Sequence, residues 1–205
     1  MSSTGNVSGG PAYIGGLVGQ NYSSPISNCY STGTVTGSTY TGGLVGYNGS
    51  SSISNSYSQS PVTIGAGGYS IGGLVGYSYG SSSISNSYAT GNINSGSDSG
   101  CLGGLVGLND TSSTISNSYA TGAVTAGANS SSIGGLVGDN NGTASNSFST
   151  GNVTSNSSLN TIGPLVGWAS VNTIANSYYV GTATNLGSGG VNSIGTQTIP
   201  SGFFT

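Results

Sequence analysis

The 205-residue chain contains no Lys, Arg, His or Glu, and its only acidic residues are Asp98, Asp110 and Asp139. Charged residues make up 1% of the sequence, against about 25% in an ordinary globular domain. Nucleic-acid binding depends on Lys and Arg neutralising phosphates, so we expect no nucleic-acid partner. Binding to an anionic membrane surface is unexpected for the same reason. No apolar run approaches the roughly 18 residues of a membrane span, so no membrane insertion is expected.

The groups that carry most enzyme chemistry are also missing. A Ser-His-Asp set needs histidine, and a zinc site needs more than two cysteines when histidine is absent. The three aspartates occur singly, in what the pattern predicts to be separate solvated loops. We therefore predict that the chain is not an enzyme, has no catalytic residues and binds neither a metal nor a cofactor.

Cysteine is scarce, and the two copies, Cys29 and Cys101, occupy different positions of the repeat described below. They are two to three repeats apart, which corresponds to on the order of 10 Å along a stack of strands. A disulfide requires Cα atoms within about 7 Å, so no bridge within the chain is predicted. Two alternatives follow, either isolated thiols or a bridge between neighbouring molecules.

Glycine, by contrast, is abundant, with 40 copies, and much of it lies in a repeated phrase, Gly-Gly-Leu-Val-Gly. The sixth copy is altered to Gly-Pro-Leu-Val-Gly, and successive leucines are 27, 30, 31, 31 and 29 residues apart. A period near thirty indicates stacked supersecondary units rather than a domain closed around one core. The leucines of the six phrases are Leu17, Leu44, Leu74, Leu105, Leu136 and Leu165.

Each repeat contains three short phrases, Ser-Thr-Gly-x-Val-Thr, x-Gly-Gly-Leu-Val-Gly and Ile-Ser-Asn-Ser-Tyr, separated by turn-forming residues. None has the 3.6-residue apolar period of a helix. The sequence therefore predicts an all-β fold, a parallel β-solenoid that forms a right-handed β-helix. We expect about 30 residues and three short strands per turn, here called a rung, and six to seven rungs. We expect residues 1–178 to form the repeats, and residues 179–205 to form a degenerate final rung and a C-terminal cap.

The phrase Ile-Ser-Asn-Ser-Tyr alternates as a strand would, with Ile, Asn and Tyr on one face and the serines on the other. We expect the first face to turn inward and the serines outward. Stacking then produces an asparagine ladder, a column whose amides bond along the stack, and beside it an aromatic column. The ladder is Asn28, Asn55, Asn86, Asn117, Asn146 and Asn176, and the aromatic column is Tyr30, Tyr57, Tyr88, Tyr119, Phe148 and Tyr178.

The glycine phrase does not alternate cleanly, because Leu74 lies on the opposite face from Ile71 and Val75. Either the glycine pair bends the strand so that both side chains point inward, or one apolar column is exposed as a seam for another molecule. We favour the bend.

In the phrase Ser-Thr-Gly-x-Val-Thr, Val35 is expected to point inward and its neighbours outward. The outward columns form an uncharged strip of hydroxyl and amide groups, here called the Thr/Asn strip. The copy at residues 58–63 is degenerate because Pro61 precedes Val62. The strip comprises Asn6/Ser8, Thr34/Thr36, Asn92/Asn94, Ala123/Thr125, Asn152/Thr154 and Thr182/Thr184.

The combined pattern of Gly-Leu-Val-Gly, Ile-Ser-Asn-Ser-Tyr and Ala-Thr-Gly-x-Val-Thr closely resembles the GLUG-motif repeat, over nearly the whole of residues 3–181. That repeat occurs in large secreted and cell-surface proteins of bacteria and archaea, including adhesin-like proteins. The resemblance implies a surface-exposed repeat region, extracellular or on the cell surface, and supplies no catalytic residues.

Three functions are compatible with these observations. The first is a stiff extracellular shaft in a surface or adhesin-like assembly. The second is a filament subunit that self-associates head to tail, since near-zero charge removes repulsion between copies and such contacts do not close. The third is recognition of ice or a glycan by the Thr/Asn strip. The expected partners are accordingly further copies or neighbouring repeats, and a glycan or other cell surface.

Overall fold

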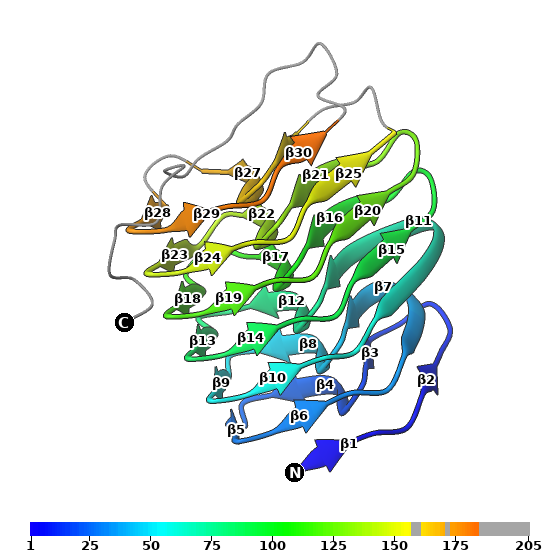
Figure 1. The fold of residues 1–205 in the computed structure, drawn as a ribbon. Coiled ribbons are helices and arrows are strands. Elements are labelled where there is room, and N and C mark those ends of the chain that lie inside the picture. The colour runs from blue at the N-terminus through cyan, green and yellow to red at the C-terminus, as the bar shows by residue number, and fades with distance from the viewer. Residues whose placement is uncertain (157–160, 171–172, 185–205) are drawn as a thin grey trace.

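The computed structural model describes residues 1–156, 161–170 and 173–184, and the chain there forms strands and turns without a helix. The strands stack into four sheets that rise through about six turns of a β-solenoid, with about 30 residues in each (Figure 1). The predicted fold class, a parallel β-solenoid, is confirmed. Most of the predicted segment 179–205 lies outside the described residues.

Each sheet collects one part of every rung. Sheet A contains β1 (Ser2–Ser3), β6 (Tyr30–Ser31), β10 (Tyr57–Ser58), β14 (Tyr88–Ala89), β19 (Tyr119–Ala120), β24 (Phe148–Ser149) and β29 (Tyr178–Tyr179). Sheet B contains β2 (Val7–Ser8), β3 (Ile14–Gly15), β7 (Val35–Gly42), β11 (Val62–Gly72), β15 (Ile93–Ser95), β16 (Gly100–Gly103), β20 (Val124–Ala126), β21 (Ser131–Gly134), β25 (Val153–Ser155), β26 (Ile162–Gly163) and β30 (Ala183–Thr184).

The other two sheets have six strands each. Sheet C contains β4 (Val18–Tyr22), β8 (Val45–Gly49), β12 (Val75–Tyr79), β17 (Val106–Asn109), β22 (Val137–Asn140) and β27 (Val166–Ala169). Sheet D contains β5 (Ile26–Ser27), β9 (Ser52–Ser54), β13 (Ser83–Ser85), β18 (Thr114–Ser116), β23 (Thr143–Ser145) and β28 (Ile174–Ala175).

The number of strands per rung was predicted wrongly as three. A rung such as residues 93–120 has five, β15, β16, β17, β18 and β19, because two of the three phrases are folded in the middle. The glycine phrase is split between the end of β16 and the start of β17, and Ile-Ser-Asn-Ser-Tyr is split between β18 and β19. In β7 and β11 the first two strands of the rung merge into one.

All of the strand pairings are parallel, and equivalent residues of successive rungs are partners. Val45 pairs with Val75, and Val75 with Val106. The glycine turns stack in the same way, since the Leu44 amide donates to the Leu74 carbonyl at 3.0 Å and the Leu74 amide to the Leu105 carbonyl at 2.9 Å. Each side chain therefore lies above and below its own counterparts.

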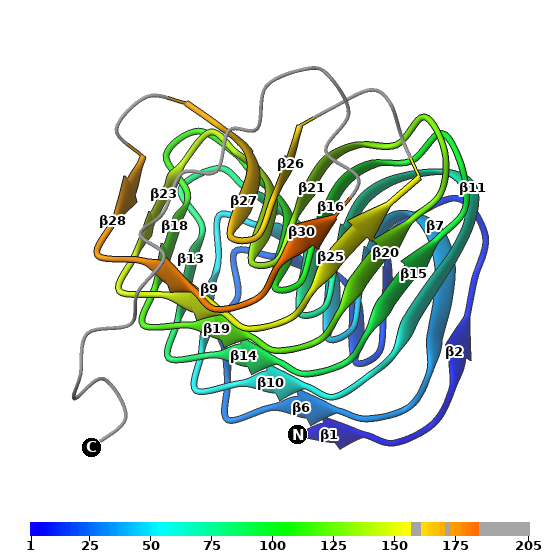
Figure 2. The same cartoon turned by 45° about the horizontal axis from the view of Figure 1, so that its top comes forward.

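The glycine phrase bends, as favoured above, and both of its apolar side chains are buried: Leu74 and Val75 are each 0% exposed. Figure 2 shows the successive turns, such as the one between β26 and β27, running into the middle of the cross-section. There the turn meets sheet A, where the Ser31 hydroxyl donates to the Gly43 carbonyl at 2.7 Å. The interior is consequently divided into two lobes with separate apolar clusters, one containing Leu74 and Ile84 and the other Ile71 and Ile93.

Each glycine of the phrase is required by a close backbone contact. A Cβ on Gly72 would collide with the carbonyl oxygen of Val75 in its own turn, and one on Gly73 with the carbonyl oxygen of Gly104 in the next rung. The third glycine, Gly76, packs against the backbone of the preceding rung, where a Cβ would come within 2.7 Å of the Tyr40 carbonyl carbon. The phrase therefore allows two strands to pack back to back with no side chain between them.

The predicted orientation of the Ile-Ser-Asn-Ser-Tyr phrase is wrong after its first two residues. Its asparagines have φ between 45° and 55°, the left-handed conformation that Asn tolerates better than most residues. This turn makes a corner between sheets D and A and reverses the alternation. Ile84 and Ser87 are buried, Asn86 is exposed and Tyr88 lies half-buried on the outer face.

The corner asparagines, Asn28, Asn55, Asn86, Asn117, Asn146 and Asn176, are thus exposed rather than inward, and among the described residues their side chains make no hydrogen bond to one another. The buried serines beside them hold the corner together. The Ser87 hydroxyl accepts from the Ser56 amide at 3.2 Å and donates to the Ser85 carbonyl at 2.7 Å. The same pair of bonds recurs at Ser118, with the Ser87 amide as donor.

A buried asparagine ladder does exist, in a column of sheet C that the sequence analysis missed. The Asn21 amide donates to Asn48 Oδ1 at 2.8 Å, and the Asn109 amide to Asn140 Oδ1 at 2.8 Å. Ser78 lies between Asn48 and Asn109 in this column and interrupts it. Ser78 Oγ and Asn109 Oδ1 are buried and have no hydrogen-bond partner in the described part of the chain.

We predict that Gly73→Ala destabilises the protein by about 3 kcal/mol, since the new methyl group must displace backbone of the neighbouring rung. Gly65→Ala is the matched control, because no atom lies within 4 Å of a Cβ added at Gly65. Its free energy of unfolding should remain within about 1 kcal/mol of wild type. Urea unfolding followed by circular dichroism measures both, and equal effects of the two substitutions would contradict the steric role of Gly73.

We predict that Ser78→Asn stabilises the protein by about 1 kcal/mol, because it completes the ladder and supplies a donor to Asn109 Oδ1. Ser78→Ala is the control and should be nearly neutral, since the Ser78 hydroxyl has no partner to lose. The same urea titration tests this pair, and a destabilised Ser78→Asn variant would show that the column cannot hold an asparagine side chain at this rung.

Candidate functional site

Among the described residues, no three or more Cys, Asp, Glu or His side chains are grouped so that they could hold a metal ion. Asp98 is exposed, and hydrogen bonds from Ser97 and Asn129 lower the pKa of its carboxyl group. The prediction that Asp139 lies in a solvated loop is wrong. Asp139 is half-buried in β22, between Leu108 and Trp168 in its column. No helix long and apolar enough to cross a membrane occurs in the part of the chain described.

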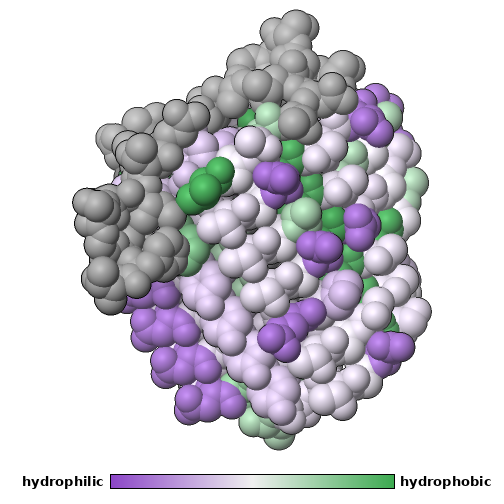
Figure 3. Space-filling model, in the orientation of Figure 1, coloured by the Kyte–Doolittle hydropathy of each residue, from purple (hydrophilic) through white to green (hydrophobic). Residues whose placement is uncertain are grey.

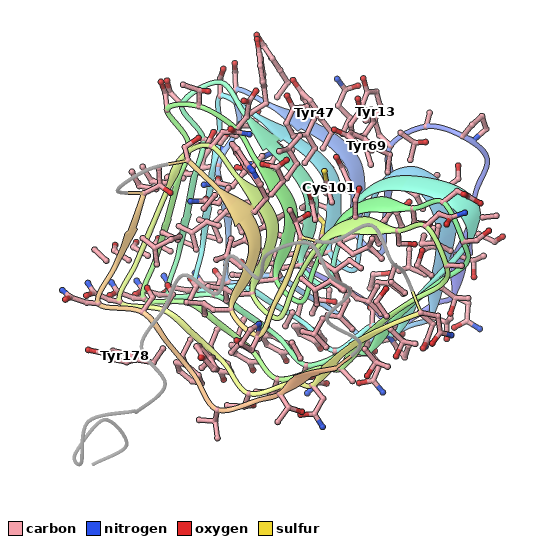
Figure 4. All side chains as sticks on the ribbon, turned by 90° about the horizontal axis from the view of Figure 1, so that it is seen from above. Tyr13, Tyr47, Tyr69, Cys101 and Tyr178 are labelled. Atoms are coloured by element: carbon pink, nitrogen blue, oxygen red, sulfur yellow. The ribbon has the colours of Figure 1, made fainter. Side chains whose placement is uncertain are left out.

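The most distinctive surface feature is a group of seven tyrosines, here called the tyrosine cluster. They flank the outer side of the glycine turns in the first three rungs. On one side they lie just before β3 and in β7 and β11, and on the other side they lie in β4, β8 and β12. Figure 4 shows Tyr13, Tyr47 and Tyr69 together on this side, with Cys101 next to them, and Tyr178 on the opposite side. The members are Tyr13, Tyr22, Tyr40, Tyr47, Tyr69, Tyr77 and Tyr79.

The rings of the cluster contact one another across the two strands that flank the turn. Tyr40 stacks on Tyr13 with ring centroids 5.4 Å apart and on Tyr77 with centroids 5.3 Å apart. Tyr47 meets Tyr13 at 5.1 Å and Tyr77 at 5.6 Å. Such contacts contribute about 0.5–1.5 kcal/mol each, and they fix Tyr40, Tyr47 and Tyr77 as a half-buried base for the cluster.

Two glycines let the outer rings lie close to the backbone. A Cβ on Gly49 would come within 2.6 Å of the Tyr47 ring and 2.9 Å of the Tyr22 ring. One on Gly100 would come within 3.2 Å of the Tyr69 ring. The cluster therefore stays partly open to solvent: Tyr22 is 62% exposed, and Tyr69 is 44% exposed.

Polar groups line the edge of the cluster toward the fourth and fifth rungs. The Tyr77 hydroxyl donates to Asp110 Oδ2 at 2.8 Å, and burial together with this bond raises the pKa of Tyr77. Cys101 Sγ lies 3.9 Å from Asp139 Oδ2. Burial of the thiol, together with the nearby Asp139 carboxylate, raises the pKa of Cys101 to about 12. Burial also raises the pKa of Asp139.

The aromatic column predicted from the sequence lies on the outer face of sheet A, away from the tyrosine cluster. Successive rings are parallel: Tyr57 and Tyr88 are 4.9 Å apart with planes 1° apart, and Tyr119 and Phe148 are 4.9 Å apart at 7°. The ring faces are therefore covered by neighbouring rings, and the solvent meets their edges. The expected inward orientation is wrong, because the corner asparagine turns the following serine inward instead.

The Thr/Asn strip lies beside this column and is irregular. Its asparagines are used within the fold, since Asn6 Oδ1 accepts from the Thr34 amide and Asn92 Oδ1 from the Ala123 amide, each at 2.9 Å. Pro61 occupies the same column without breaking register. At the equivalent positions the backbone N–H, as in Thr34 and Ala123, donates to a side chain and not to a backbone carbonyl, so a proline removes no bond of the backbone ladder. Figure 3 shows this face as columns of mostly neutral hydropathy, with hydrophilic side chains stacked along the edge where β9 meets β10.

The predicted leucine column, Leu17, Leu44, Leu74, Leu105, Leu136 and Leu165, lies inside the solenoid and is structural. The sequence analysis missed the tyrosine cluster, although its members fall at constant offsets from these leucines. Tyr13 and Tyr40 are four residues before a leucine, and Tyr47 and Tyr77 three residues after one. That signal was hidden because it appears only in the first three repeats.

Comparison with known proteins agrees with the repeat structure. A family model described as the GLUG motif matches residues 10–36, 37–64, 67–94 and 98–125, more than half of the chain. A search of curated proteins found no match.

We predict that iodoacetamide at pH 8 modifies Cys29 and leaves Cys101 unmodified in the folded protein. Cys101 is 4% exposed, and with a pKa of about 12 its thiol is almost entirely protonated at that pH, whereas only thiolate reacts. Below pH 12 the reaction at Cys101 should accelerate as the pH rises. Chymotryptic peptides analysed by mass spectrometry report both sites, with urea-unfolded protein as the control. Equal labelling of the two cysteines at pH 8 would contradict the burial of Cys101.

Proposed function

Because the chain belongs to the GLUG-motif repeat family, we propose that it is a non-enzymatic structural module, a stiff shaft in an extracellular or cell-surface assembly. The observation that carries this proposal is the in-register pairing of every rung with the same segments of its neighbours. In such an array the length is set by the number of rungs, and stability is the sum of rung and interface terms. The absence of Lys and Arg, and hence of trypsin sites, suits exposure to proteases.

The modular role predicts that a rung can be added without loss of folding. Duplicating residues 74–104 inserts one full period between Gly104 and Leu105, so each copy meets the same neighbours as before. We expect the longer chain to fold, to unfold at the same or higher urea concentration, and to gain about 4.8 Å along the solenoid axis. Circular dichroism and small-angle X-ray scattering measure these properties. A control that duplicates only residues 74–88, half a period, should fail to fold, and equal behaviour of the two insertions would refute the modular reading.

One observation favours a second candidate, a filament subunit. Ile14, Leu17 and Val18 of the first rung are only partly buried, whereas the equivalent Leu44 and Val45 of the second rung are 0% exposed. Within the described part of the chain, the first rung thus presents apolar side chains and strand edges with no partner below them, which can pair with a rung of another copy. Head-to-tail contacts of this kind continue without closing.

For the filament role we expect wild-type protein to form unbranched fibres at high concentration, visible by negative-stain electron microscopy. Val7→Lys should abolish them, because it introduces a charge at the open edge. Thr36→Lys is the control, since it adds the same charge to an exposed position of the second rung, and it should leave the fibres intact. Monomers at every concentration would refute the filament role and leave the shaft.

A further inference from the structure

The tyrosine cluster is not required by the fold, and the repeat itself shows this. Tyr77 pairs with Leu108 in the next rung, and that column continues with Asp139. Tyr69 pairs with Gly100, and its column continues with Ser131. The fourth and fifth rungs therefore keep the same backbone with small, polar or aliphatic residues at these positions, and an aromatic residue returns to the Tyr77 column only at Trp168 in the sixth. Seven tyrosines gathered on three rungs of one face call for a role other than folding.

The cluster also supplies most of the strongly exposed large apolar side chains of the described residues. Six large apolar side chains are strongly exposed in the described residues, and Tyr13, Tyr22, Tyr69 and Tyr79 are four of them. A concentrated exposed patch of this kind marks an interaction site. In contrast to the stacked rings of sheet A, the outer rings of the cluster rest beside glycine backbone at Gly49 and Gly100, so they keep surface open to a ligand.

We propose that the tyrosine cluster binds a neutral glycan chain. A sugar ring has faces of C–H groups bordered by hydroxyls, which match tyrosine rings bordered by hydroxyl, amide and carboxylate groups. A surface built from Tyr, Ser, Gly and Asn suits polar, hydrated ligands better than the aliphatic core of a protein partner does. Asp110 and Asp139 lie at the edge of the cluster and accept hydrogen bonds there.

The charges of the protein determine which class of glycan the cluster can bind. The chain has no Lys, Arg or His to pair with a carboxylate or sulfate, and the two aspartates at the edge of the cluster repel anions. Acidic polysaccharides are thereby disfavoured. The cluster extends over three rungs, about 10 Å along the solenoid axis, so its ligand is a chain of several sugars rather than a monosaccharide.

The test uses the full chain and three neutral hexasaccharides, cellohexaose, chitohexaose and mannohexaose, with hexagalacturonate as the acidic counterpart. Binding is measured by isothermal titration calorimetry and by saturation-transfer NMR. We expect at least one neutral hexasaccharide to bind, with saturation transfer from tyrosine ring protons, and hexagalacturonate not to bind.

The double variant Tyr69→Ser and Tyr79→Asn should weaken that binding at least tenfold. The new residues occupy the equivalent positions of the fifth rung, at Ser131 and Asn141, so the backbone tolerates them. Tyr30→Ser is the matched control: it removes a ring from sheet A at a position paired with Ser2, and it should bind as wild type does. Circular dichroism verifies that both variants are folded.

Failure of all three neutral hexasaccharides to bind would overturn the proposal, as would binding that the double variant retains. If the double variant instead abolishes a dimer seen by light scattering and no hexasaccharide binds, the cluster is an interface between copies and the glycan proposal is wrong. These outcomes are independent of the shaft and filament tests, which concern rung stacking.

Discussion

Every feature of this protein depends on the backbone hydrogen bonds that join a segment to the same segment one rung away. The spacing of strands, about 4.8 Å, brings each side chain against its own counterparts. Like charges directly opposite one another on paired strands are destabilising, so a charged residue copied into every rung would oppose the stack. The near absence of charge follows from this geometry. No aspartate is repeated at the same position of the next rung, and Asp139 lies between Leu108 and Trp168 in its column.

The same close stacking of backbones explains why the glycine phrase is needed. Its turn enters the middle of each rung, reaches sheet A and separates two apolar lobes. The three glycines are needed because the backbone approaches another backbone at three places, at Gly72, Gly73 and Gly76. A smaller solenoid with one undivided core would need no such phrase. The motif that identifies the family in the sequence is thus the turn that enters the interior of each rung and divides its core.

Residues that repeat from rung to rung and residues that differ between rungs have different explanations in this protein. Columns that recur from rung to rung, such as the buried corner serines from Ser56 to Ser177, are accounted for by stacking alone. Ser78, by contrast, breaks the buried asparagine ladder and leaves Asn109 Oδ1 without a partner. The tyrosine cluster is the largest departure, since it occupies three rungs at positions that the fourth and fifth rungs fill with small, polar or aliphatic residues.

The sequence by itself determined the period, the parallel stacking and the inward column of Val35, because a thirty-residue repeat with strand-length phrases has few other ways to bury its apolar residues. It favoured the bend that buries Leu74 over an exposed leucine column, and the structure decided between the two. The path of each rung in cross-section was decided only by the tertiary structure. Alternation predicted that Asn86 and Tyr88 face inward, and the left-handed turn at Asn86 reversed it. The five strands per rung, the two lobes and the tyrosine cluster likewise arise from contacts between residues distant along the chain. Periodicity describes what each rung shares with the next, whereas these features depend on where the chain bends within a rung.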